Sequence, residues 1–188
     1  MIFGRGDAEN IVIYEQISNA LPAFDAFVMH SSVVEVDGGA YCFAADSGTG
    51  KSTHTRYWKE TLGDRMTVIN GDKPIYRFED DKLMAYGTPW SGKEHWQTKT
   101  SAPLMALCLL ERGSENAIYP VDAFEFMGEL IHHFHLPGSG QVDMVKMMEL
   151  VDRMVNTVPI YRLRCRNDIS AAKEAIRYFG LEEKGYED

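Results

Sequence analysis

Cysteine, basic charge and long apolar runs are all scarce in this sequence. The three cysteines among its 188 residues are widely spaced and form no CxxC pair, which argues against a disulfide framework. Cys42 and Cys108 lie in apolar, strand-like runs, so we predict that they are buried free thiols. No apolar run reaches about 18 residues, which excludes a membrane-spanning helix of the usual kind. The formal net charge of -9 gives no support to binding of nucleic acid or anionic membranes.

What remains is the composition of an ordinary globular protein, with 45% apolar and 25% charged residues. The N-terminus lacks a basic start followed by an apolar stretch, so we predict no secretory signal. Together with the unpaired cysteines, this predicts a cytoplasmic protein in a reducing compartment.

Apolar periodicity and turn residues predict alternating helices and strands. The predicted helices cover residues 10–21, 51–62, 123–134, 141–157 and 169–179. The predicted strands cover residues 26–36, 40–45, 66–71, 73–78, 82–87, 103–113, 116–121 and 159–165. The continuous apolar run 103–113 is typical of a buried central strand, and 116–121 is a candidate neighbour of it. Because hairpins precede the helical crossovers, we predict an α/β protein with a mixed sheet.

The most specific motif is Ser47-Gly48-Thr49-Gly50-Lys51-Ser52-Thr53, between the strand "AYCFAA" and a predicted helix. Glycines let several backbone N–H groups point into one concavity, where they can hold phosphates with the positive end of the helix. Lys51 would reach the β- and γ-phosphates of a nucleotide, and the Ser52 hydroxyl would bind Mg²⁺. The usual pattern, G-x-x-x-x-G-K-[ST], has glycine where this chain has Ala45. The alternative, a glycine-rich turn capping a helix, does not explain a lysine beside two hydroxyl residues.

Asp72 follows the next apolar strand, in "VINGDKP", so we expect its carboxylate at the sheet edge beside the glycine loop. There it would bind Mg²⁺ or accept a proton from an acceptor hydroxyl. The alternative is a turn aspartate that caps "KPIY".

These motifs resemble the HPr kinase/phosphorylase family and, more remotely, the ATP-dependent phosphoenolpyruvate carboxykinases. The shared part of the loop is S-G-x-G-K-[ST], here residues 47–52. His30 before Ser31 is similar to that family's histidine on the preceding strand, and Asp72 to the second of its paired aspartates. "ALP-x-[FY]-DAF", "SGTGKSTHTR", "DKP" and "GTPW-x-GK" are similar to a bacterial group of HPr-kinase-like proteins over nearly the whole chain. Resemblance to HPr kinase proper covers roughly residues 28–95.

The resemblance implies a P-loop domain with a mixed sheet flanked by helices, and phosphoryl transfer from ATP with Mg²⁺ to a hydroxyl, typically a serine. It implies one nucleotide-binding domain over residues 1–188, with an N-terminal helical segment (1–22), a P-loop core (28–120) and a helical and strand completion (121–188). HPr kinases assemble as hexamers, so a homo-oligomer is an expectation. A second expectation is that this chain is short before "YEQISNALP", where relatives of the bacterial group have additional residues.

Two departures from the family pattern bear on mechanism. Gly71 stands at the first of the paired aspartate positions, and "AYGTPWSGK" has no glutamate. A nucleotide-binding regulatory module with weak or no turnover is therefore the alternative to a kinase. Carboxykinase chemistry is a third reading, but it needs a larger chain and more metal ligands.

Several weaker candidates complete the predicted site. His30 either orients Asp72 or touches the γ-phosphate, or it is a hydrogen-bonded core histidine. Lys73 is either a surface turn lysine or a second phosphate contact. Lys93, in the polar loop 87–96, would neutralise charge in the transition state. Trp90 and Trp96 of the same loop would form a lid or acceptor platform, unless they only pin the loop to the surface.

Three further features have mainly structural interpretations. Arg56 either faces the site or is a solvated helix residue. His132 and His135 in "HHFH" share a helical face, but no evident set of further ligands completes a metal site. The methionines of the predicted helix 141–157 are expected to pack in the core: Met144, Met147, Met148 and Met154.

Overall fold

The computed structural model describes residues 5–136 and 144–182. The helices are α1 (Arg5–Ala20), α2 (Lys51–Leu62), α3 (Ala123–Leu130), α4 (Met144–Thr157) and α5 (Ser170–Tyr178). The strands are β1 (Ala26–Val28), β2 (Ser31–Val36), β3 (Gly39–Ala44), β4 (Met66–Asn70), β5 (Ile75–Glu79), β6 (Lys82–Tyr86), β7 (Ser101–Arg112), β8 (Ala117–Pro120) and β9 (Ile160–Cys165). Short 3-10 helices cover Leu21–Phe24, Gly63–Arg65 and Ile131–His133.

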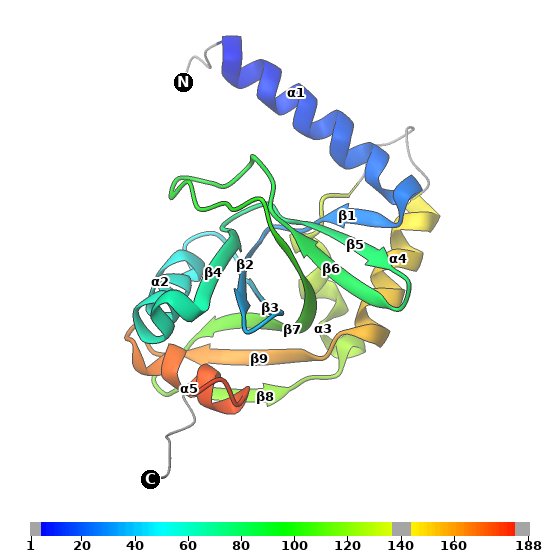
Figure 1. Cartoon of the computed structure of the whole chain (residues 1–188). Coiled ribbons are helices and arrows are strands. Elements are labelled where there is room, and N and C mark those ends of the chain that lie inside the picture. Colours follow the sequence, from blue (N-terminus) through cyan, green and yellow to red (C-terminus); the bar gives the residue numbers. More distant parts are fainter. Residues whose placement is uncertain (1–4, 137–143, 183–188) are drawn as a thin grey trace.

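The sheet is mixed, as predicted, and β7 is its central strand. The start of β7 pairs antiparallel with β6, which continues through β5 to β1. The remainder of β7 pairs in parallel with β3 on one side and β9 on the other. Strands β2 and β4 extend the sheet beyond β3 by antiparallel pairing. The parallel arrangement brings the C-terminal ends of β3, β7 and β9 to one edge of the sheet (Figure 1).

Helices cover both faces of this sheet (Figure 1). On β7, Leu107 and Leu109 face a core shared with α3 and α4, whereas Cys108 and Leu110 face a core shared with α2 and α5. Successive side chains of a strand point to opposite faces, so a strand buried on both faces reads as a continuous apolar run. The mixed α/β fold and the buried central strand are therefore confirmed. Cys42 and Cys108 are buried free thiols, also as predicted.

The predicted strand 26–36 is interrupted. β1 pairs with β5, whereas β2 pairs with β3 and β4, and His30 lies between them. The backbone N–H groups of His30 and Ser31 leave the ladder and donate to His133 O (2.6 Å) and Asp72 O (3.0 Å). This break frees the His30 side chain from the sheet and places it beside Asp72.

The predicted pairing of 116–121 with the central strand is wrong. β8 pairs antiparallel with β9, and β9 lies between β8 and β7. β9, in which Ile160, Arg162 and Leu163 are buried, takes the place beside β7, and the more exposed β8 is left at the sheet edge.

The N-terminal helix α1 extends away from the body of the protein (Figure 1). Ile13 and Ile17, which follow the helical spacing, are 49% and 40% exposed. The face that packs carries Tyr14 and the buried Ser18. The apolar spacing therefore predicted the helix without indicating the face that it buries.

The other helices agree with the predictions in most respects. Asp122 caps α3 by accepting from the Phe124 N–H, and Asp168 accepts from the Ser170 N–H at the start of α5. In α4, Met147 and Met154 are buried, but Met144 and Met148 are each 42% exposed, so the prediction of a methionine core holds for two of the four. The predicted start of this helix at residue 141 lies outside the described residues. Within those residues, no helix has the length and hydropathy needed to cross a membrane.

Candidate functional site

The glycine loop connects β3 to α2 at the edge of the sheet where the parallel strands end (Figure 1). Gly48 and Gly50 have φ values of 84° and 124°, a region in which other residues are strained. The Thr49 N–H closes the turn on Asp46 O at 3.1 Å, and α2 begins at Lys51. The predicted residues Ser47, Gly48, Thr49 and Gly50 thus form the turn, and Ser52 and Thr53 lie in the first helical turn.

Lys51 bends back over the loop and is nearly buried, with 9% of its surface exposed. Its ammonium group donates to Ala45 O at 2.6 Å and to His30 Nε2 at 3.0 Å. Burial lowers the pKa of Lys51 below its ordinary value, and the negative charges of Asp72 and Asp46 oppose this shift. Ala45, which departs from the usual glycine pattern, therefore contributes its carbonyl as a resting partner of the lysine.

His30 connects Lys51 to Asp72. Its Nδ1 lies 3.0 Å from Asp72 Oδ1. Because an ammonium group can only donate, His30 Nε2 must be an unprotonated acceptor, so the ring proton is on Nδ1 and is donated to Asp72. The hydrogen bond from His30 lowers the pKa of Asp72, against the opposing effect of burial. The structure thus brings together three residues from different parts of the sequence: Lys51, His30 and Asp72.

Asn70 fixes the turn that carries Asp72. This fully buried side chain accepts from the backbone N–H groups of Asp72 and Lys73, each at 2.8 Å. Its amide nitrogen donates to Thr88 O and Thr88 Oγ1, which ties the turn to the loop 87–96. Sequence reasoning missed Asn70, although an asparagine that ends a strand before Gly-Asp is a known signal for such a turn.

The loop 87–96 lies directly on Asp72. A Cβ atom at Gly92 would be 3.1 Å from Asp72 Cβ, and a Cβ at Gly87 would clash with Thr98 O at 1.9 Å. Both glycines allow the loop to approach closely. Lys93 is exposed and contacts none of the described residues that form the Lys51–His30–Asp72 group, so its predicted role as a charge-neutralising group stays a prediction.

The two tryptophans of this loop lie in different surroundings. The Trp90 ring packs edge-on against Tyr14 of α1 at 5.1 Å. Trp96 packs near Gly71 and lines a separate groove with Arg56. Arg56 pairs with Glu60 on the helix surface, 3.9 Å away, as its structural interpretation expects. The tryptophans therefore do not form one platform.

Lys73 and Tyr14 form another unpredicted contact beside the site. The Lys73 ammonium lies 4.4 Å from the centre of the Tyr14 ring, a cation–π contact. Lys73 is thereby committed to α1, and its positive charge also contributes to the lowered pKa of Asp72. The N-terminal helix thus reaches the edge of the candidate site.

The "HHFH" segment contributes to the site through a residue that the sequence did not single out. His133 is buried, its backbone carbonyl accepts from His30, and its pKa is lowered by burial and by the charge of Lys51. His132 is exposed and His135 follows the end of the 3-10 helix, so the two do not share a helical face as predicted. No group of three or more metal-ligating side chains occurs within residues 5–136 and 144–182.

Arg112 is a third residue that sequence reasoning missed. It ends β7, and its guanidinium donates to Gly48 O at 2.5 Å and Thr49 O at 3.2 Å. The pairing that brings it there is a feature of the tertiary structure, because β7 runs parallel to β3 and parallel strands end at the same sheet edge. Arg112 both holds the glycine loop and adds positive charge beside it.

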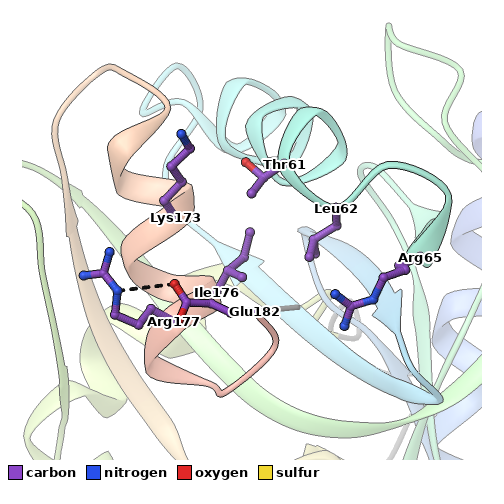
Figure 2. Close-up of a pocket in the computed structure, with 7 residues that line it drawn as sticks. All are labelled: Thr61, Leu62, Arg65, Lys173, Ile176, Arg177 and Glu182. Atoms are coloured by element: carbon purple, nitrogen blue, oxygen red, sulfur yellow. Dashed lines mark hydrogen bonds and ion pairs between the residues drawn. The ribbon is translucent and has the colours of Figure 1, made fainter. Parts of the chain in front are cut away.

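Another cavity, of about 290 Å³, lies at the far end of α2 against α5 (Figure 2). Its arginines already have carboxylate partners: Arg65 pairs with Asp37, and Arg177 pairs with Glu182 and Glu174. The floor is formed by the apolar Leu62 and Ile176. The charges in this cavity are already balanced, and no residue of the glycine loop lines it. We therefore do not assign it to the site.

Buried behind the glycine loop, His54 gives a pH-dependent prediction for stability. The Trp58 N–H donates to its Nε2 at 2.9 Å, and burial lowers the pKa of His54 to about 3. The unfolded chain takes up a proton near pH 6.5, but the folded protein does not. The stability that neutral His54 contributes is full above pH 6.5 and falls as the pH drops toward 3, by about 1.4 kcal/mol per pH unit.

Urea unfolding at pH 7 and pH 5 measures this effect. Between the two pH values we expect the wild type to lose about 2 kcal/mol more than a His54→Gln variant, because the glutamine side chain has no proton to take up. Equal pH dependence in both proteins would show that His54 is not the titrating group.

The geometry defines the site as a glycine loop beside which a lysine, a histidine and an aspartate form one chain of contacts. Comparisons with known proteins add one finding. No family model matches the chain, and no curated protein matches it in sequence. A solved structure, that of the Hpr(Ser) kinase/phosphatase from Coxiella burnetii, is similar with a TM-score of 0.48 and 9% sequence identity, covering 84% of this chain and 99% of that one.

Proposed function

We propose that this protein binds ATP with Mg²⁺ at the glycine loop and transfers the γ-phosphoryl group to a hydroxyl of a protein, peptide or small molecule. The observation that carries the proposal is the Lys51–His30–Asp72 chain of contacts, at 3.0 Å each, beside the loop. A lysine and a carboxylate at the end of one phosphate cradle are the groups that phosphoryl transfer requires.

The resting contacts suggest how these residues act. Nucleotide phosphates are stronger partners for an ammonium group than a neutral imidazole, so Lys51 exchanges His30 for phosphate oxygens when nucleotide binds. His30 keeps its Nδ1–H on Asp72 and orients that carboxylate. Asp72, held ionised by its lowered pKa, then accepts the proton of the acceptor hydroxyl as it attacks.

The oxygen atoms present fit Mg²⁺. The Ser52 hydroxyl has no hydrogen-bond partner among the described residues, and Asp72 Oδ2 is not committed to His30. Mg²⁺ in phosphoryl-transfer sites is commonly held by one or two protein oxygens together with substrate phosphates. Ser52 and Asp72 would hold the ion, which when bound would neutralise charge on the phosphates.

A second candidate function, a nucleotide-binding regulatory module with little or no turnover, is favoured by Gly71. A Cβ at this position would be 3.4 Å from both Ser91 O and Trp96 Cβ, so the loop 87–96 occupies the side on which a second carboxylate would extend. Asp46 is the other acid whose charge reaches Lys51. A single carboxylate at Asp72 would then serve for both metal and proton.

Titration calorimetry with a slowly hydrolysed ATP analogue tests the shared part of both functions. We expect the wild type to bind the analogue with a Kd of about 1–100 μM in the presence of Mg²⁺, and roughly tenfold more weakly when Mg²⁺ is chelated, because the phosphate charges are then less neutralised. No binding by the folded protein would contradict both candidate functions.

A further inference from the structure

A small cleft lies beside the glycine loop and the start of α2. Its lining includes Thr49, Gly50 and Thr53, together with Arg166 and Asn167, which follow β9. His30, Lys51 and Asp72 do not line it. The glycine loop therefore has two ends with different chemistry.

The direction of a bound nucleotide follows from these two ends. The lysine of such a loop contacts the β- and γ-phosphates, so the end with Lys51 and Asp72 is the γ-phosphate end. The rest of the nucleotide must then leave the loop along the first turn of α2, past Thr53. That path leads to the cleft.

The side chains around the cleft suit a nucleoside. Arg112 has no carboxylate partner among the described residues, since its guanidinium is bound only to loop carbonyls. Tyr57, one helical turn after Thr53, presents a partly exposed ring. Asn167 lines the cleft with an amide group that makes no hydrogen bond to any described residue. A base is recognised by a surface on which to stack and by polar groups at its edge.

We propose that this cleft takes the nucleoside end of the nucleotide, with the base against Tyr57 and the guanidinium of Arg112, and with Asn167 at the polar edge of the base. This inference rests on the proposed nucleotide-binding function and adds where the base lies and which residues recognise it.

The wall that carries Asn167 is held in place from outside the cleft. The Arg166 backbone N–H donates to Asn116 Oδ1 at 2.8 Å, and the Asn116 amide donates to Ser170 Oγ at 2.7 Å. Arg166 also pairs with Asp168 at 3.2 Å. The cleft volume is about 30 Å³, the room of one water molecule, so the base would lie across the mouth of the cleft rather than inside it.

The test compares MgATP with Mg-tripolyphosphate, which has the phosphates but no nucleoside. By calorimetry, we expect the wild type to bind both, with ATP at least tenfold tighter. Asn167→Ala and Tyr57→Leu should each weaken ATP binding by about three- to tenfold and leave tripolyphosphate binding unchanged. Tyr119→Leu and Asn156→Ala, exposed residues on β8 and α4, serve as matched controls and should change neither affinity.

The outcomes separate this inference from the proposed function. If the wild type binds ATP and tripolyphosphate equally, or if the cleft variants bind ATP like the wild type, the phosphate cradle stands and the nucleoside cleft is overturned. If the cleft variants lose both ligands equally while remaining folded, the residues do not recognise the base and the inference is also overturned. If the wild type binds neither ligand, the proposed function itself fails, and this inference with it.

Discussion

Replacing Lys51 by methionine is expected to weaken binding of MgATP at least about 100-fold, or roughly 3 kcal/mol. Methionine keeps most of the aliphatic stem but removes the ammonium group that would bind the phosphates. Because Lys51 is nearly buried, a cation from the protein surface would not easily take its place beside the phosphates. Titration calorimetry with the slowly hydrolysed ATP analogue measures the loss.

The fold should survive this substitution. The variant loses the hydrogen bonds from the ammonium group to Ala45 O and to His30 Nε2, a cost of about 1 kcal/mol each, so the melting temperature should fall by only several degrees. Lys82→Met is the matched control, because Lys82 is exposed at the start of β6, and we expect wild-type affinity. Wild-type affinity in folded Lys51→Met would show that the loop does not bind nucleotide in the way proposed.

The second large effect is expected on turnover. Asp72→Asn should lower the rate of phosphoryl transfer by about 10²–10⁴-fold, since the amide cannot accept the proton of the acceptor hydroxyl. The amide oxygen can still accept from His30 Nδ1–H, so the geometry of the turn is kept. Affinity for the ATP analogue at saturating Mg²⁺ should stay within about threefold of the wild type.

A radiolabelled ATP assay with hydroxyl-containing proteins and small molecules, alongside slow hydrolysis by water, supplies the readout. Asp81→Asn, in the exposed turn between β5 and β6, is the control and should react like the wild type. A wild-type rate in Asp72→Asn would exclude this carboxylate as the base. A wild type that binds nucleotide but transfers phosphate to neither acceptor nor water would favour the regulatory module.

Two further residues, Asn70 and His30, would position the reacting groups rather than react themselves. Asn70 contacts only the backbone of the Asp72 turn and the loop at Thr88, so it acts by holding Asp72 in place. His30 contacts both Lys51 and Asp72 and therefore sets the distance between cation and carboxylate before nucleotide binds.

Local sequence was sufficient for the parts of the site that one segment builds. The glycine loop, the start of α2 at Lys51 and the turn at Asp72 depend on nearby backbone conformation, which glycine and asparagine encode directly. The same is true of the hairpin β5–β6 and of the central strand, whose unbroken apolar run requires burial on both faces.

The sequence by itself determined the local elements of the candidate site, a glycine loop and a strand-end aspartate, and the mixed α/β class of the fold. Only the tertiary structure decided which distant groups complete the site. Arg112 and His133 reach it because β7 runs parallel to β3 and because the β1–β2 break receives the Ile131–His133 segment. Tertiary packing likewise decided which face of α1 is exposed and that β8 lies at the sheet edge. Several apolar surfaces can pack on the same sheet, and only some of them are buried by it. Such pairings depend on the whole chain, because a strand or helix encodes what it can bury but not which partner buries it.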